Sequence, residues 1–250
     1  FFALIGGKNQ ENNFHIDSML DEISHRGPDG RGKINFDEKT NFGHVRLAIL
    51  DIDHGYQPMI SECGRYLLVF NGEIYNFEEH RKNLINKGYK FKGYCDSEVL
   101  LTLLINEGKR CLQKLNGMFA FVFYDKVSGE WLAARDHFGI KPLYYCKLQN
   151  GIAFASEMKA LLKHPEIKRN LNIEGLHDYL TFQFVLGDST LFKGIRKIEP
   201  ASYLIGNVNT SQEIYIQKWW KMDFSIDYEH SSSWFQEKLS LQLPAQLVLT

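Results

Sequence analysis

The sequence predicts an α+β fold in which antiparallel sheets are covered by helices. Apolar runs of strand length follow one another at short turns such as Ser128-Gly129 and Asn150-Gly151, which join neighbouring strands as hairpins. Segments with helical spacing are few, and the regular strand-helix-strand alternation of a parallel sheet is absent. The 18 Phe and 12 Tyr residues favour the same sheet-rich core.

Apolar runs that end at turn residues predict the strands. The first run starts at Phe1 and ends at Gly6-Gly7, so the beginning of the given chain is expected to lie inside the sheet. The run that reaches Phe70 leads directly into Asn71-Gly72. In chain order, the predicted strands cover residues 1–5, 43–50, 66–70, 118–125, 131–135, 143–148 and 152–155.

Apolar residues at helical spacing predict four helices. In the first, Ile16, Met19, Leu20 and Ile23 form one face, and the opposite face is acidic. Glycine ends the second helix at residue 88 and the third at residue 108, as expected where a helix must stop. The predicted helices cover residues 16–23, 77–87, 96–107 and 157–162.

Composition and charge narrow the class of ligand. A chain of 250 residues suits one large domain, or one domain with part of another. The 29 basic and 30 acidic residues form no long run of one sign, so neither nucleic acid nor an anionic membrane is an expected partner. A small neutral or zwitterionic ligand fits this balance better.

No targeting or metal-binding pattern stands out along the chain. No apolar stretch reaches the roughly 20 residues of a membrane span, and no basic segment precedes an apolar one at the N-terminus, so we expect a soluble, cytoplasmic protein. The cysteines lie far apart without a Cys-x-x-Cys spacing, which indicates neither a zinc site nor a redox pair. Reduced and mostly buried thiols are expected at Cys63, Cys95, Cys111 and Cys146.

The stretch Val69–Asn76 is the centre of the functional interpretation. Asn-Gly is a strong sequence for a tight turn, so a hairpin at Asn71-Gly72 is one interpretation. The other starts from the chemistry of three consecutive residues, an amide side chain, a glycine and the carboxylate of Glu73. An Asn side-chain N–H and a Gly backbone N–H that converge on one point form an oxyanion hole for acyl transfer.

Three further polar positions each have two interpretations. Arg46 interrupts an apolar run, and its guanidinium needs a carboxylate, either in an internal ion pair or on a ligand. Asp96 stands where an N-cap is expected, and it is equally placed to receive a ligand's ammonium group. The loop of residues 25–30 is either a turn held by Arg26 and Asp29 or part of a site wall, and its turn residues favour the first.

An ordered set of motifs resembles a known family. Together the motifs are similar to the glutaminase domain of class II glutamine amidotransferases, and in particular to that of the glutamine-hydrolysing asparagine synthetases. The motifs are His-Arg-Gly-Pro-Asp (25–29), Gly-His-x-Arg-Leu-x-Ile (43–49), Gln57-Pro58, Phe-Asn-Gly-Glu-Ile-Tyr-Asn (70–76), residues 96–101, Asn-Gly-Met-Phe-Ala-Phe (116–121), Ala-Arg-Asp-x-Phe-Gly-Ile-Lys-Pro-Leu-Tyr-Tyr (134–145), Phe-Ala-Ser-Glu-Met-Lys-Ala-Leu (154–161) and residues 190–200.

The resemblance implies a fold and a set of site residues. The fold is that of the N-terminal-nucleophile hydrolases, a four-layer αββα sandwich of two antiparallel sheets. Arg46 would bind the α-carboxylate of glutamine, Glu73 and Asp96 its α-ammonium, and Asn71 with Gly72 would form the oxyanion hole. The implied substrate-binding residues are Arg46, Leu47, Ala48, Ile49, Leu50, Asn71, Gly72, Glu73 and Asp96.

The resemblance also implies the reaction and exposes one departure. Members hydrolyse L-glutamine to glutamate and ammonia with an N-terminal cysteine, followed by glycine, whose own α-amine handles the proton. This sequence begins at Phe1, which aligns just after that Cys-Gly pair, so we expect the given sequence to omit the nucleophile. A catalytically dead glutamine-binding module is the alternative. Cys95 is a poor substitute because no base accompanies it.

Residues 1–205 are therefore expected to form the glutaminase domain. Residues 206–250 would be a linker and the start of an ATP-dependent synthetase domain that amidates aspartate to asparagine. The Ser-Gly-Gly-x-Asp-Ser signature of that domain is absent, so ATP and Mg are expected only beyond this sequence. The resemblance implies no metal or cofactor in the glutaminase domain, and ammonia would pass Arg26 and Met118 on its way out. The sequence leaves open whether the chain forms a homodimer.

Overall fold

The computed structural model describes residues 1–6, 15–47 and 55–223. The chain has two compact units, Phe1–Trp219 and Trp220–Thr250, and residues 220–223 of the second are described. The strands are β1 (Phe2–Gly6), β2 (Gly30–Asp37), β3 (Thr40–Arg46), β4 (Met59–Ile60), β5 (Tyr66–Ile74), β6 (Gly117–Asp125), β7 (Glu130–Arg135), β8 (Tyr144–Leu148), β9 (Gly151–Ala155), β10 (Ile195–Lys197), β11 (Ser202–Asn207) and β12 (Ser211–Lys218).

Helices connect and cover these strands. The helices are α2 (Ile16–Glu22), α3 (Phe77–Asn86), α4 (Asp96–Glu107), α5 (Met158–Leu161) and α6 (Ile173–Phe182), with 3-10 turns η1 (Ser24–Arg26) and η2 (Gly108–Lys114). Each predicted helix is present within a few residues of its expected bounds, and Gly88 and Gly108 both take the positive φ of a helix-ending glycine.

The described strands form two six-stranded sheets. The first has the order β10-β8-β9-β1-β3-β2, and the second has the order β12-β11-β7-β6-β5-β4. Every pairing between these named strands is antiparallel. The α+β class predicted from the hairpin turns is confirmed.

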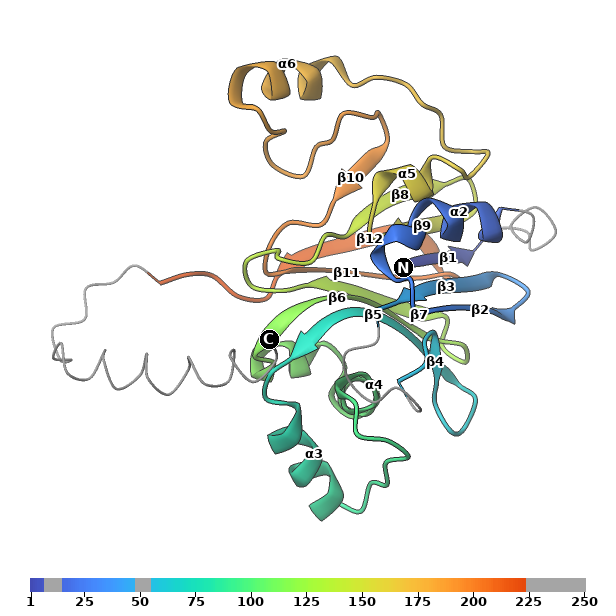
Figure 1. Ribbon diagram of the computed structural model, residues 1–250, viewed down its shortest axis with the longest axis vertical. Coiled ribbons are helices and arrows are strands. Elements are labelled where there is room, and N and C mark those ends of the chain that lie inside the picture. Colours follow the sequence, from blue (N-terminus) through green and yellow to red (C-terminus); the bar gives the residue numbers. More distant parts are fainter. Residues whose placement is uncertain (7–14, 48–54, 224–250) are drawn as a thin grey trace, which may run out of the picture. The chain divides into compact units, whose positions relative to one another are not determined.

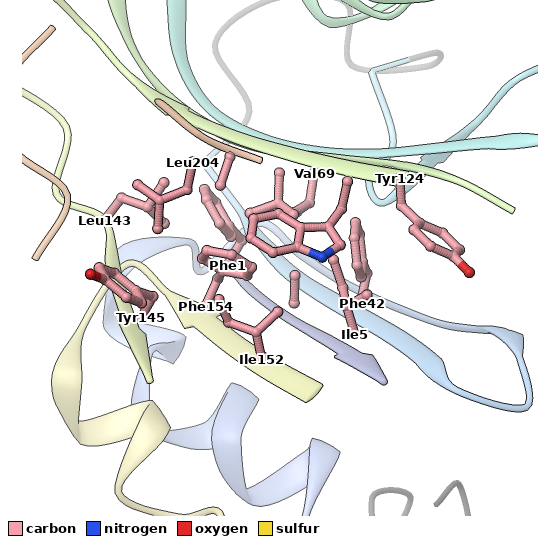
Figure 2. Close-up of a cluster of buried hydrophobic side chains, with 14 of the residues drawn as sticks. Phe1, Ile5, Phe42, Val69, Tyr124, Leu143, Tyr145, Ile152, Phe154 and Leu204 are labelled. Atoms are coloured by element: carbon pink, nitrogen blue, oxygen red, sulfur yellow. The ribbon is translucent and has the colours of Figure 1, made fainter. Parts of the chain in front are cut away.

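Strand β1 lies in the middle of the first sheet and has two buried faces. Phe1, Ala3 and Ile5 belong to a core that also contains Val69 and Leu204 of the second sheet. Figure 2 shows Phe1, Ile5, Val69 and Leu204 between the two sheets. Side chains alternate across a strand, so Phe2 and Leu4 point the other way, into a core shared with α2 and α5. Burying one such side chain contributes roughly 1.5–3 kcal/mol.

Helices cover the outer face of each sheet. Apolar residues of α2 and α5 pack on the sheet that contains β1, whereas α4 packs on β5 with α3 beside it (Figure 1). The four-layer αββα sandwich implied by the family resemblance is confirmed.

The structure corrects two sequence-based expectations. Asn71-Gly72 is not a hairpin turn, because β5 runs without a break through both residues and pairs with β6 along its whole length. The domain boundary expected at residue 205 falls inside β11. Because β11 pairs with β7 on one side and β12 on the other, the first unit continues to Trp219.

Candidate active site

A cavity of about 330 Å³ brings together residues that are far apart in the sequence. It is lined by η1, the end of β3, the middle of β5, the start of α4 and the start of β6. The lining residues are Arg26, His44, Val45, Arg46, Leu47, Gly55, Gln57, Phe70, Asn71, Gly72, Glu73, Cys95, Asp96, Ser97, Met118 and Lys141. Of the predicted site residues, Arg46, Leu47, Asn71, Gly72, Glu73 and Asp96 meet here, whereas Ala48, Ile49 and Leu50 lie outside the described residues.

The β5 wall of the cavity carries Asn71 and Gly72. The side-chain nitrogen Nδ2 of Asn71 is buried and has no acceptor among the described residues, which is an unusual state for a buried donor. Gly72 has φ +157°, and a Cβ atom there would lie 2.1 Å from the carbonyl oxygen of Met118 on β6. Only glycine fits this close approach of two backbones. This wall therefore has an unpaired amide donor, Nδ2 of Asn71, next to the backbone of Gly72, which no side chain covers.

Two carboxyl groups lie in the same cavity. Burial, followed by the charge of Asp96, raises the pKa of Glu73 to about 7, although Lys141 acts in the opposite direction. Burial also raises the pKa of Asp96 to about 6, while hydrogen bonds from backbone N–H groups, that of Ile74 first, act to lower it. The raised pKa values mean that nearby groups do not fully offset the cost of burying the two negative charges. A cation in the cavity would therefore stabilise the carboxylate forms.

Asp96 does not occupy the N-cap position that its sequence context suggested. Cys95 takes that position, and Asp96 is the first helical residue of α4. Its Oδ2 accepts a hydrogen bond of 3.0 Å from the backbone N–H of Ile74 on β5. This bond ties the helix to the strand and holds the carboxyl group at the cavity.

Arg46 approaches the cavity from the other sheet. It is the last residue of β3, and its guanidinium carbon lies 5.3 Å from the centre of the Tyr56 ring. Its backbone oxygen accepts a hydrogen bond of 3.0 Å from the N–H of Asp29. The cavity thus combines acidic side chains from β5 and α4 with cationic ones, Arg46 from β3 together with Arg26 and Lys141. Both signs of charge are present in it, as a zwitterionic ligand requires.

The loop after α2 combines both of its interpretations. Nη1 of Arg26 lies 3.0 Å from Oε1 of Glu157, and Nε2 of His25 lies 2.8 Å from the same oxygen. Arg26 also lines the cavity. The loop is therefore a structured turn that also contributes to the site wall.

Comparison with known proteins identifies the family. The model for the glutamine amidotransferase domain matches residues 2–220. The chain belongs to this family. It is 40% identical over 212 residues to asparagine synthetase [glutamine-hydrolyzing] 1 of Bacillus subtilis (strain 168), which covers 84% of this chain and 32% of that protein. It is 34% identical over 211 residues to amidase chry2 of Gibberella zeae, covering 84% of this chain and 30% of that protein.

Solved structures agree on the fold of this amidotransferase domain. Glutamine phosphoribosylpyrophosphate amidotransferase from B. subtilis superposes with a TM-score of 0.60 at 21% identity, over 87% of this chain and 48% of that one. The chain spans about a third of the length of the curated relatives it matches. The predicted resemblance to class II glutamine amidotransferases is confirmed.

Several residues of the amidotransferase cavity were not predicted from the sequence. His44 lies two positions before Arg46, so the period of two along a strand already placed both on one face. Gln57 and Lys141 had no local pattern to indicate them, although both lie in quoted motifs. Cys95 lines the cavity, but burial raises the pKa of its thiol, which favours the unreactive protonated form.

The described residues of this domain contain neither a candidate membrane span nor a candidate metal cluster. None of the helices there combines the length and apolar content needed to cross a bilayer. No group of at least three His, Cys, Asp or Glu residues is arranged there to hold a metal ion.

Proposed function

We propose that this domain binds L-glutamine and hydrolyses it to glutamate and ammonia. Arg46 binds the α-carboxylate of glutamine, and Glu73 and Asp96 bind its α-ammonium. The strongest support is the presence of two acids with raised pKa values and an arginine in one cavity with an unpaired amide donor. Ligands that lack the zwitterion leave a charged group desolvated and unpaired, so they bind poorly.

In the proposed reaction a cysteine thiolate attacks the carboxamide carbon of glutamine. The negative charge that develops on the carbonyl oxygen is stabilised by Nδ2 of Asn71 and the backbone N–H of Gly72. The C–N bond breaks, the leaving nitrogen takes a proton and departs as ammonia, and a thioester remains. Water then attacks the thioester carbon, which releases glutamate and restores the thiol.

The register of β1 supports a position for this cysteine. Phe2 pairs with Gly43 of β3, so a residue two places before Phe1 would stand opposite Arg46. By strand alternation its side chain shares a face with Phe1, which points between the sheets. The nitrogen of Phe1 lies 2.9 Å from Oγ of the buried Ser156, which anchors the start of the strand. A Cys-Gly pair ahead of Phe1 would bring the thiol to the cavity.

We propose further that the domain serves an asparagine synthetase. The support is the 40% identity to asparagine synthetase [glutamine-hydrolyzing] 1 of Bacillus subtilis, together with residues 190–200, which resemble the asparagine synthetases. Ammonia would then amidate aspartate in a synthetase domain, and ATP and Mg would bind there. Arg26 and Met118, which line the cavity, are the residues that we propose ammonia passes on its way out.

The experiment that tests this proposal compares two versions of the chain. One begins Cys-Gly ahead of Phe1 with a free α-amine, and its control begins Ala-Gly. We expect both to bind glutamine by calorimetry and only the first to release glutamate. Binding by both versions with hydrolysis by neither would contradict the glutaminase proposal and leave a glutamine-binding module. Absence of binding in both would contradict the whole assignment of the cavity.

A further inference from the structure

His44 is a buried histidine whose tautomer follows from its surroundings. It lies on β3, has 7% of its surface exposed and lines the cavity. Its Nε2 is 3.2 Å from the backbone oxygen of Phe70 on β5. A carbonyl oxygen only accepts hydrogen bonds, so Nε2 carries the proton and Nδ1 is a bare acceptor. Burial lowers the pKa of His44 to about 3, so the ring stays neutral near pH 7.

The bare acceptor has no partner within the described residues. Nδ1 of His44 is buried there without a hydrogen-bond donor, as Nδ2 of Asn71 is buried without an acceptor. An unpaired buried polar group costs roughly 1–3 kcal/mol, so two such groups on residues that line one cavity suggest a shared ligand. One is an acceptor and the other is a donor. A primary carboxamide presents the complementary pair, an NH2 group and a carbonyl oxygen.

The contacts around Phe70 connect these two groups. The carbonyl oxygen of Phe70 accepts from His44, and its backbone N–H donates to Oε1 of Gln57 at 2.6 Å. Asn71 follows directly on β5. Phe70, the residue before Asn71, is thus held through both its backbone N–H and its carbonyl oxygen, and His44 is fixed by the second of these contacts. The donor and the acceptor are therefore positioned together before a ligand arrives.

We propose that Nδ1 of His44 accepts a hydrogen bond from the side-chain NH2 of glutamine and so selects the carboxamide over a carboxylate. This inference rests on the proposed glutamine-binding function of the cavity. Glutamate, the product, has only acceptor oxygens at its side-chain end, and one of them would face the lone pair of Nδ1. The repulsion weakens product binding, whereas the substrate pairs both of its amide groups.

Two substitutions separate this role from a structural one. His44→Gln can keep a donor to Phe70, because its Nε2 is four bonds from Cα, as Nε2 of histidine is, but it has no acceptor three bonds from Cα, where Nδ1 of histidine stands. His44→Asn can keep an acceptor, since its Oδ1 is three bonds from Cα, as Nδ1 is, but it loses the contact with Phe70. Glutamine and glutamate affinities are measured by calorimetry on the given chain, and thermal unfolding reports the fold of each variant.

For the unsubstituted chain we expect tighter binding of glutamine than of glutamate. His44→Gln should weaken glutamine binding about tenfold, the value of one lost hydrogen bond, and leave glutamate binding unchanged or tighter. His44→Asn should keep the preference for glutamine while lowering the melting temperature. The inference would be overturned if His44→Gln kept the preference for glutamine over glutamate, or if His44→Asn lost it. His44 would then only connect the two sheets. The proposed function survives that result, whereas failure of the unsubstituted chain to bind glutamine removes both.

Discussion

Two carboxylates in this domain have opposite surroundings. Asp136 is fully buried, and its oxygens accept hydrogen bonds from the backbone N–H groups of Phe119, Phe138, Ile140 and Lys141. Glu73 lies in the cavity wall. Its carboxyl group has no hydrogen bond or ion pair within the described residues, and its pKa is raised to about 7, first by burial. The first acid is used entirely by the fold, and the second is available to a ligand.

The neighbours of the two acids strengthen this contrast. Beside Asp136, the guanidinium of Arg135 donates to the backbone oxygens of Lys141, Ile198 and Gly139, which holds the loop of residues 135–141 closed. That loop delivers the side chain of Lys141 to the cavity that contains Glu73. Polar groups that are saturated support the structure, whereas those with unused capacity mark the site.

The largest expected effect is on the structural side of this comparison. Asp136→Ala removes the acceptor of four buried or half-buried backbone N–H groups, so we expect a loss of at least about 3 kcal/mol in the free energy of unfolding. Urea denaturation of the variant and the unsubstituted chain measures this difference. One ordinary hydrogen bond contributes on the order of 1 kcal/mol. A smaller loss than this would show that Asp136 is not essential to the loop.

The next effect lies on the ligand side. Glu73→Gln removes a carboxylate that the fold leaves without a partner, so stability at pH 7 should be unchanged or slightly higher. Glutamine affinity should fall about 100-fold, because a buried ammonium would lose one of its two anionic partners. Calorimetry measures the affinity, and denaturation on the same samples measures the stability. Asp96→Asn is the matched variant, since its amide oxygen can still accept from Ile74. Unchanged affinity in both variants would contradict the role of the acids.

The smallest effect is a dependence of binding on pH. The pKa values of about 7 for Glu73 and about 6 for Asp96 mean that both carboxyls are mostly protonated at pH 5.5 and mostly ionised at pH 7.5. Bound ammonium favours the ionised forms and releases protons, so glutamine affinity should rise by at least about tenfold across this interval and level off above pH 7.5. Calorimetric titrations at several pH values test it. In Glu73→Gln the rise should be smaller and centred near the lower pKa, and a flat profile for the unsubstituted chain would contradict the assignment.

Local sequence patterns were sufficient for most helices and strands of this fold. Consecutive residues alone show the alternation of side chains along β1, β6 and β7. They also show the glycines that end α3 and α4. β2 was not predicted, because it is an edge strand whose residues alternate between exposed and half-buried, without an apolar run. Of the two interpretations of Asn71-Gly72, the hairpin turn was wrong, because pairing along the whole of β6 outweighs the local preference for a turn.

Residue types and motif order established the family. They also predicted the site residues Arg46, Asn71, Gly72, Glu73 and Asp96, because a guanidinium, an amide or a carboxylate has the same chemistry wherever it lies in the chain. Their arrival in one cavity depended on the stacking of two sheets, which no neighbouring residues encode. The raised pKa values and the single tautomer of His44 exist only after folding has removed water and brought β3 against β5, because an electrostatic environment is a property of spatial neighbours rather than of sequence neighbours.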